Sequence, residues 1–223
     1  MSEARKPRIS TRKEPKQTRS RQLVSDILIA AGRVLAREGA HRFTVARVAE
    51  EAGVSVGSFY QYFPNKEAIL FRLQSEEWIR TRSLIAEILS NKSVPSLDRL
   101  RSVVLEFVRS ECEEAQLRRA LDDAVPMYRT APEAIKLQQE GKHLSDAFFE
   151  EALPNLNKNK TRVIAEITMM CMKSVGKQIS EMHLSAKEVD DRAHALADMF
   201  CAYLNDCEGS TAENDIDAHH HFN

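Results

Sequence analysis

A short stretch of the chain gathers side chains that form hydrogen bonds without carrying charge. From Ser55 to Tyr62 the sequence reads Ser-Val-Gly-Ser-Phe-Tyr-Gln-Tyr, and Lys66 follows shortly after it. Hydroxyl and amide groups bond well to base edges and phosphate oxygens, and a lysine beside the free N–H groups of a helix start can hold an anion. These residue types favour contact with a nucleic acid, although Lys66 read alone is also compatible with an ordinary surface lysine.

The local sequence predicts a helix, a glycine turn and a second short helix over about residues 44–63. Thr44 precedes apolar residues at helical spacing and is a suitable N-cap. Gly53 allows the left-handed backbone of a sharp turn, and Ser55 can cap the second helix. A compact unit of this kind presents its second helix to the DNA major groove.

The second helix is expected to have two different faces. Phe59 and Phe63 are four residues apart and are predicted to point inward. Gly57 leaves room for close approach of a groove wall. The residues predicted to face outward are Val56, Ser58, Gln61 and Tyr62.

Arg47 stands where a complete capping box would place Glu or Gln. A cation near a helix start is mildly unfavourable with the helix dipole, so solvent or a phosphate is a natural destination for its guanidinium group. A solvated surface arginine remains the alternative.

Flanking helices are predicted on both sides of this motif. Residues 22–38 have the apolar spacing of an amphipathic helix, with Gly39 as its C-terminal cap residue. Pro64 ends the second motif helix, and Asn65 can cap a long helix from Lys66 to about Leu89.

The composition indicates an all-α protein, and its length suits one sizeable domain or a small domain joined to a larger one. Of 223 residues, 43% are hydrophobic and 29% charged, with only 7 Gly and 7 Pro, whereas β-sandwiches and barrels need many turns. An apolar run of transmembrane length and a secretory signal are both missing from the sequence, so we expect a cytoplasmic protein without membrane contact.

Charge is distributed unevenly along the chain. Residues 1–22 carry a net charge of +6, residues 23–81 are neutral and residues 82–223 carry −7. This suggests that one end of the protein approaches a polyanion. Residues 1–20 are expected to form a basic flexible arm, which either lies along phosphates or is disordered without specific contacts. His219–His221 offer at most a weak metal site at the end of the chain, and we expect no metal and no cofactor.

The part of the chain beyond residue 90 is predicted to be helical throughout. Two long helices, over about residues 161–184 and 186–204, have wide apolar faces. They can pair with a second copy as a four-helix bundle, or their apolar faces can serve only the core of one chain. Residues 208–223 are expected to form a polar tail.

Residues 21–81 resemble the DNA-binding domain of TetR-family transcriptional regulators. The resemblance rests on Gly39, Phe43-Thr44, Val48-Ala49, Ala52-Gly53-Val54-Ser55, Gly57-Ser58, Phe59-Tyr60, Tyr62-Phe63, Asn65-Lys66-Glu67 and Leu70. It implies an N-terminal three-helix helix-turn-helix domain, followed over residues 82–207 by a larger helical domain for ligand binding and dimerisation. It also implies a homodimer, formed by the last two helices, that binds a palindromic operator in double-stranded DNA.

The resemblance assigns roles to individual residues. Thr44, Tyr60 and Lys66 are implied to hold backbone phosphates. Base contacts are implied for the start of the first motif helix and the exposed face of the second. With Arg47 and Ser55 added, the predicted DNA-binding residues are Thr44, Val45, Ala46, Arg47, Ser55, Val56, Gly57, Ser58, Tyr60, Gln61, Tyr62 and Lys66. Ala46 and Val56 occupy positions where some family members have long polar side chains. Recognition of bases is therefore expected to depend on Gln61, Tyr62, contacts with thymine methyl groups and DNA shape.

Family members also enclose a ligand pocket among their middle helices. Methionine and aromatic side chains suit a small, lipophilic effector, and the candidates are Trp78, Phe107, Met127, Tyr128, Phe148, Phe149 and Met169. The expected function is a homodimeric repressor that such an effector releases from DNA. Two alternatives are a ligand-independent DNA-binding regulator and an enzyme with its site in the helical body. Because the sequence has no nucleophile elbow, phosphate-cradling loop or metal-ligand motif, we expect no catalytic residues.

Overall fold

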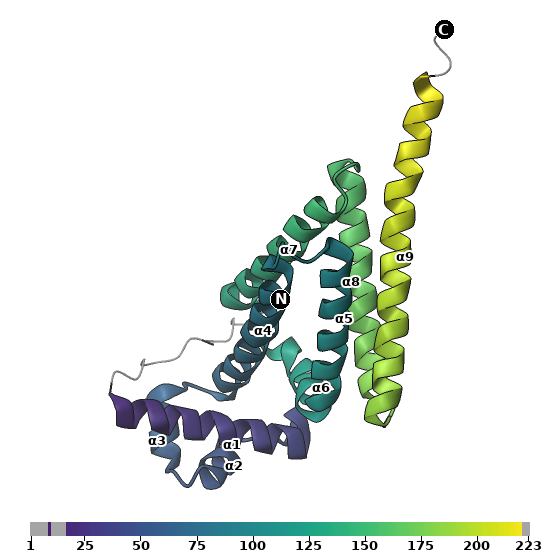
Figure 1. Ribbon diagram of the computed structural model, residues 1–223. Helices are drawn as coiled ribbons and strands as arrows, with labels where there is room; N and C mark the ends of the chain where they lie inside the picture. Colours follow the sequence, from purple (N-terminus) through teal and green to yellow (C-terminus); the bar gives the residue numbers. More distant parts are fainter. Residues whose placement is uncertain (1–8, 10–16, 220–223) are drawn as a thin grey trace, which may run out of the picture. The chain divides into compact units, whose positions relative to one another are not determined.

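The computed structural model describes Ile9 and residues 17–219, and all regular structure within them is helical (Figure 1). The elements in order are α1 (Thr18–Arg42), α2 (Val45–Glu51), α3 (Val56–Tyr62), α4 (Lys66–Ser90), α5 (Ser96–Glu113), α6 (Ala115–Ala124), the short 3₁₀ helix η1 (Val125–Met127), α7 (Pro132–Ala152), α8 (Lys158–Ser180) and α9 (Ala186–His219). The predicted all-α class is confirmed. In the described part of the chain, no helix is long and apolar enough to cross a membrane.

The chain forms two compact units, each made of two segments. Unit 1 contains the described residues up to 80 together with residues 116–139, and unit 2 contains residues 81–115 and those from 140 onward. The helices α4 and α7 therefore each contribute to both units. The domain limits inferred from the sequence remain a prediction. The unit that holds α1, α2 and α3 also includes most of α6, η1 and the start of α7.

Helix α1 begins earlier than predicted, and its backbone is interrupted at Gly39, where the sequence predicted its end. It starts at Thr18, and the backbone N–H of Gln17 donates to the hydroxyl of Ser20 at 3.2 Å. At Gly39 the backbone leaves the helical region, with φ +74° and ψ 169°. Residues that carry a side chain rarely adopt this backbone conformation. Gly39 therefore interrupts the helix, although the element continues to Arg42. Of the predicted basic arm, residues 1–8 and 10–16 lie outside the described residues, while the side chain of Ile9 is buried in the core of unit 1.

The core of unit 1 is built from aromatic and aliphatic side chains on several helices. Phe43, Phe59, Phe63, Ile69 and Tyr128 are among its fully buried members. Burying such side chains is the main stabilising term for a small unit. Tyr128 follows η1, so the apolar core extends from the helix-turn-helix segment to the second chain segment of the same unit.

A chain of polar contacts also crosses the interior of unit 1. The hydroxyl of Tyr128 donates to Gln74 Oε1 at 3.2 Å, and Gln74 Nε2 donates to Glu77 Oε2 at 3.3 Å. The other oxygen of Glu77 lies 2.5 Å from a guanidinium nitrogen of Arg118 on α6. Buried polar groups are tolerated when they are bonded in this way. These contacts connect α4 with α6 and with the end of η1.

In unit 2, α5 packs against α8 and α9 (Figure 1). Gly176 of α8 packs against Phe107 of α5, and an added Cβ at Gly176 would lie 2.9 Å from Cε1 of Phe107. A glycine is therefore needed for this packing distance. Arg99 is buried on α5 and donates to the carbonyl oxygens of Leu89 at 2.5 Å and Val94 at 3.0 Å, and it pairs with Glu151 at 2.5 Å.

The last two helices differ from the predicted ranges. Helix α8 begins at Lys158, where Asn157 accepts a hydrogen bond from the N–H of Lys160 at 3.0 Å, and it ends at Ser180. Helix α9 was predicted to end near Leu204, but it continues to His219. Residues 220–223 of the predicted tail lie outside the described residues.

Candidate nucleic-acid interface

The turn between α2 and α3 has the geometry that the sequence predicted. Thr44 Oγ1 accepts a hydrogen bond from the N–H of Arg47 at 3.4 Å, and Ser55 Oγ accepts one from the N–H of Ser58 at 3.0 Å. Gly53 has φ +65°, in the left-handed region that favours glycine. Each short helix therefore begins at a hydroxyl cap, and a glycine turn sets the direction between them.

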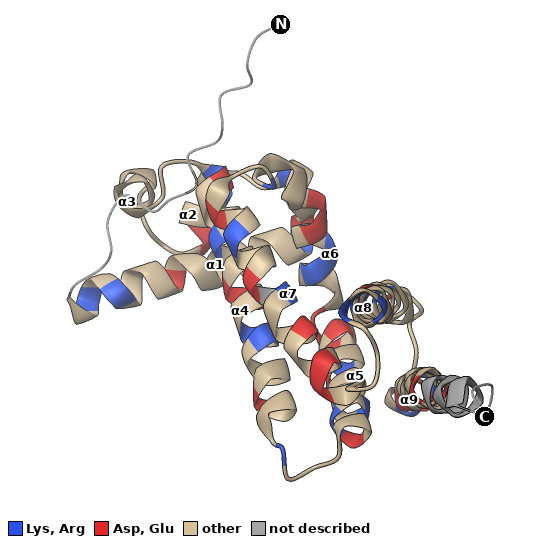
Figure 2. Ribbon diagram, turned by 90° about the horizontal axis from the view of Figure 1, so that it is seen from above, with Lys and Arg blue, Asp and Glu red and all other residues tan. Residues whose placement is uncertain are grey.

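Helix α3 has one apolar face and one exposed face. Phe59 and Phe63 are completely buried, with ring centroids 5.5 Å apart. On the other side Gln61 is exposed, and the exposed fractions of Val56 and Tyr60 are 43% and 40%. Helix α3 carries no charged residue, as Figure 2 shows. Its accessible face is therefore an uncharged surface with hydroxyl and amide groups, which suits bonding to bases and phosphates.

Tyr62 does not belong to this exposed face, and the prediction that it faces outward is wrong. Only 7% of the residue is exposed, and it is part of the core of unit 1. The reason is its position on the helix, because Tyr62 lies three residues after Phe59. Residues at this spacing share one face, so packing of the two phenylalanines turns Tyr62 inward with them.

Arg47 is engaged by groups of the protein itself. Its guanidinium group forms an ion pair with Glu38 and donates to the carbonyl oxygen of Arg42 at 3.3 Å. Desolvation raises the pKa of Glu38, but the hydrogen bond from Arg37 and the charge of Arg47 outweigh it and leave the pKa below its ordinary value. The carboxylate thus stays ionised, and a phosphate would compete with it for Arg47.

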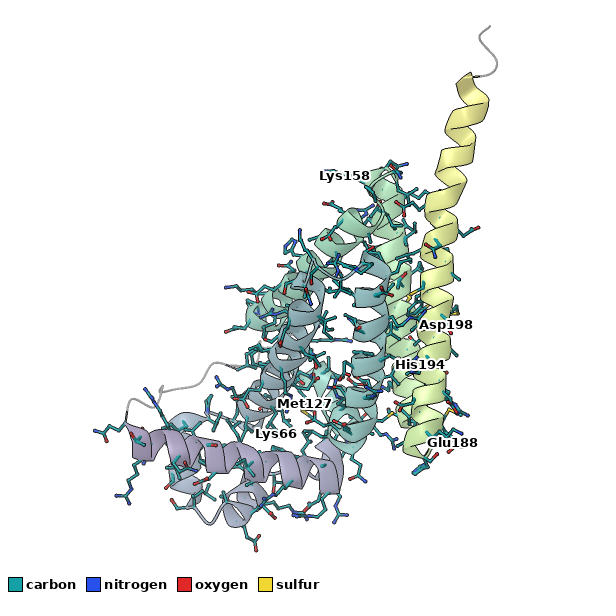
Figure 3. The ribbon with its side chains drawn as sticks, in the orientation of Figure 1. Lys66, Met127, Lys158, Glu188, His194 and Asp198 are labelled. Carbon is teal, nitrogen blue, oxygen red and sulfur yellow. The ribbon has the colours of Figure 1, made fainter. Side chains whose placement is uncertain are left out.

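Lys66 is the first residue of α4, as predicted. The side chain of Asn65 accepts a hydrogen bond from the N–H of Ala68 at 2.8 Å and so caps this helix. Lys66 is half-buried and lies at the start of α4 in Figure 3. The charge of the lysine and the free N–H groups of the first turn together make this end of α4 suitable for a phosphate.

The remaining predicted interface residues are mostly accessible. Val45 packs partly against the core of unit 1, and Ser58 is half-buried with its hydroxyl 2.9 Å from that of Ser55. The exposed members besides those of α3 already described are Thr44, Ala46, Ser55 and Gly57. Their roles toward DNA remain predictions.

The seven predicted ligand contacts are divided between the two units. Trp78, Met127 and Tyr128 belong to unit 1, where Tyr128 is completely buried. The unit 2 members are Phe107, Phe148, Phe149 and Met169, of which only Met169 is not buried. A hollow of about 170 Å³ in unit 2 is lined by none of the seven. Its lining residues are Asp146, Glu150, Lys158, Asn159, Thr161, Arg162 and Ala165.

Sequence reasoning missed this hollow and its charged lining. The available signal was a repeat of charges at helical spacing, at Asp146 and Glu150 before the loop and at Lys158 and Arg162 after it. That pattern marks one face of each helix. No group of His, Cys, Asp and Glu in the described part of the chain could hold a metal ion.

Comparison with known proteins identifies the family over most of the chain. The model described as "Bacterial regulatory proteins, tetR family" matches residues 27–73. The model described as "Tetracyclin repressor-like, C-terminal domain" matches residues 95–207, which is half of the chain.

Curated relatives agree with this result. The HTH-type transcriptional repressor KstR of Rhodococcus jostii is 28% identical over 160 residues, which cover 68% of this chain and 70% of that protein. The fatty acid metabolism regulator protein of Bacillus subtilis is 45% identical over 51 residues, or 23% of this chain. The matched part spans only 26% of the Bacillus protein.

Solved structures share the fold. The fatty acid degradation regulator FadR from Bacillus halodurans has a TM-score of 0.65 at 19% identity, covering 84% of this chain and 97% of that one. NalD of Pseudomonas aeruginosa, the secondary repressor of the MexAB-OprM multidrug efflux pump, has a TM-score of 0.59 at 18% identity and covers 82% and 96%. Together with the two matching family models, these findings show that the chain belongs to the TetR family of transcriptional regulators.

Proposed function

We propose that this DNA-binding regulator is a homodimeric repressor that a small, lipophilic ligand releases from a palindromic operator. The observation that carries the DNA-binding part is the two-faced helix α3. Phe59, Tyr62 and Phe63 fix its apolar face in the core, and Gln61 and Tyr60 stand on its accessible side. A helix held in this way keeps its orientation when it enters a major groove.

Two groups of residues make different contacts with the DNA. Thr44, Tyr60 and Lys66 bond to phosphates and set the position of α3 on the duplex. Gln61 and Val56 reach base edges, the amide by hydrogen bonds and the valine by contact with a thymine methyl group. Phosphate contacts supply a salt-dependent affinity common to all sequences, and base contacts supply the preference for one site.

Exposed apolar side chains on α8 support a dimer. Val163, Ile167 and Met170 follow one another at intervals of four and three residues and are 53%, 45% and 61% exposed. Side chains at this spacing share one face of the helix. On α9, Met199 and Tyr203 are also exposed and are four residues apart. Two copies that pair α8 and α9 would bury these residues in a four-helix bundle. A two-fold axis would then relate the two α3 helices.

A charge placed in this apolar row tests the dimer. We expect Met170→Glu to give a monomer in sedimentation velocity and to lose operator binding, because two like charges would meet near the symmetry axis. Ile135→Glu is the matched control, since Ile135 is an exposed apolar residue on α7 in unit 1. If the Met170 variant stays a dimer with unchanged operator affinity, the proposed interface is wrong.

A ligand-independent regulator is the second candidate function. The complete burial of Tyr128 and Phe149 favours it, because both side chains act as core residues instead of lining a site. The two candidates are separated by adding a panel of lipophilic compounds to the preformed complex and following the fluorescence anisotropy of labelled operator DNA. Dissociation by any compound that leaves the protein folded supports ligand release. A complex that resists the whole panel supports the ligand-independent regulator.

A further inference from the structure

Helices α7 and α8 carry complementary charges on the faces that they turn toward each other. On α7 these are Lys142, Asp146 and Glu150, and on α8 they are Lys158, Arg162 and Glu166. Each set repeats every four residues, so each lies along one helix face. The two helices run antiparallel from the loop that joins them (Figure 1). The order of charges therefore matches Lys142 with Glu166, Asp146 with Arg162 and Glu150 with Lys158.

Only the first of these three pairs, Lys142 and Glu166, forms an ion pair in the described residues. Lys142 Nζ lies 2.8 Å from Glu166 Oε1, and this hydrogen bond, with the charge of Glu166, raises the pKa of the lysine. The other four charged side chains instead stand around the hollow of about 170 Å³. Among the described residues, none of these four forms an ion pair or a hydrogen bond with any other residue.

The hollow thus has an acidic wall and a basic wall. Asp146 and Glu150 form the wall on α7, and Lys158 and Arg162 form the wall on α8, where Figure 3 labels Lys158 at the start of the helix. Two further lining residues are buried and offer no free polar group, because Ala165 is apolar and the hydroxyl of Thr161 is already bonded to the carbonyl oxygen of Asn157 at 3.2 Å.

We propose that this α7–α8 hollow binds a small zwitterion that carries an ammonium and a carboxylate group on a short apolar chain. The ammonium group would bond to Asp146 and Glu150, and the carboxylate to Lys158 and Arg162. Like charges four residues apart repel each other on an isolated helix, so a ligand with both signs relieves the repulsion on both walls at once. A cavity of about 150 Å³ is known to hold benzene, so the volume suits a ligand of amino-acid size.

The inference changes the ligand class of the proposed ligand response from a lipophilic compound to a zwitterion with a short apolar chain. It rests on that proposal only for the consequence for DNA binding, since ligand binding to the hollow is measurable without DNA. The closed Lys142–Glu166 pair shows that the two helices come near enough for a charged group to be reached from both walls.

Three probes with the same straight alkyl chain test the proposal on the full-length protein. L-norleucine carries both charges, hexanoate only the negative one and pentylamine only the positive one. We expect isothermal titration calorimetry to show that L-norleucine binds about tenfold or more tightly than either of the others, because one charged hydrogen-bonding group is missing from each. Equal binding of the three probes, or no binding of L-norleucine, would overturn the proposal.

Neutral variants of each wall give a second, sharper readout. With Asp146→Asn and Glu150→Gln combined, L-norleucine should bind no better than hexanoate, because the ammonium group has lost its partners. With Lys158→Met and Arg162→Met combined, it should bind no better than pentylamine. Lys160→Met is the control, because Lys160 is exposed on the same helix turn and does not line the hollow.

The main alternative is that the two open pairs close on each other in solution. In that case neutralising either wall lowers the melting temperature and the wild-type protein shows no preference for L-norleucine, which contradicts the proposal. Operator binding is measured in parallel. A protein that binds its operator but not L-norleucine refutes the α7–α8 site alone, whereas one that binds L-norleucine but no DNA refutes the proposed repressor function.

Discussion

Arg118 on α6 and Glu77 on α4 form an ion pair of 2.5 Å in which both side chains are almost completely buried. Glu77 also accepts a hydrogen bond from Gln74, which in turn accepts one from Tyr128. Polar contacts between α4 and a later segment of the chain therefore stabilise the unit that contains the helix-turn-helix. Arg118 lies 41 residues after Glu77, and Tyr128 lies 54 residues after Gln74. Changes in α6 and η1 consequently act on the same folded unit as changes in α3.

Breaking this ion pair should destabilise the protein strongly. Glu77→Gln or Arg118→Met alone should lower the free energy of unfolding by about 3–5 kcal/mol, because each leaves a buried charge without its partner. The double variant should recover part of that loss. Urea denaturation of the full chain provides the measurement.

The neighbouring pair Arg72–Glu76 is the control, since it is exposed on the same helix. Arg72→Met should cost no more than about 0.5 kcal/mol. If the single variants at Glu77 and Arg118 prove as mild as this control, the buried polar contacts are not holding α6 to α4.

Two glycine-to-alanine substitutions should have opposite effects. At Gly176 the new methyl group would lie 2.9 Å from Phe107, so we expect a loss of about 1–3 kcal/mol from overpacking between α5 and α8. At Gly32, inside α1, no atom lies within 4 Å of the added Cβ, and alanine should stabilise the helix by about 0.5–1 kcal/mol. Thermal unfolding of both variants checks the pair. Equal effects of the same sign would show that the packing between α5 and α8 adjusts to the added methyl group without loss of stability.

The two tyrosines of α3 should differ in their effect on DNA binding. Tyr60→Phe and Lys66→Ala should weaken binding to every duplex and reduce the dependence of affinity on salt, because each would remove a proposed phosphate contact. Tyr62→Phe should leave affinity nearly unchanged, because that side chain is buried. Anisotropy titrations at several salt concentrations make the comparison. A stronger loss for Tyr62→Phe than for Tyr60→Phe would reverse the assignment of faces.

Gln61 should affect sequence preference more than overall affinity. Its side chain is exposed on α3 and suits bidentate bonding to adenine. Gln61→Ala should therefore cost about 1–3 kcal/mol at one base position of each half-site and relax the preference there. Affinities for a set of single-base operator variants measure this effect. Uniform weakening at all positions would mean that Gln61 does not read a base.

Local sequence signals predicted those features of the fold that depend on neighbouring residues. Thr44, Ser55 and Asn65 cap their helices, and Gly39 and Gly53 adopt positive φ, because capping and turn chemistry act over a few residues. The burial of Tyr62 is equally local, because Tyr62 lies three residues after Phe59 and so shares its helix face.

Other features depend on which helices meet, and the sequence alone does not provide that information. Gln74 and Glu77 look like surface residues of α4 until α6 and Tyr128 are placed against them. The open charge pairs of the α7–α8 hollow depend on the register between two helices. The length of α9 beyond Leu204 was missed because its polar sequence shows no apolar periodicity, although Cys207 is still buried.

The central claim is that the uncharged exposed face of α3 reads DNA as part of a symmetric dimer. The most direct test is selection of bound duplexes from random DNA by the full-length protein. The account predicts enrichment of one palindromic sequence whose half-sites lie in successive major grooves, and loss of that enrichment with Gln61→Ala. Recovered duplexes that share no sequence with one another, or an enriched site without two-fold symmetry, would contradict it.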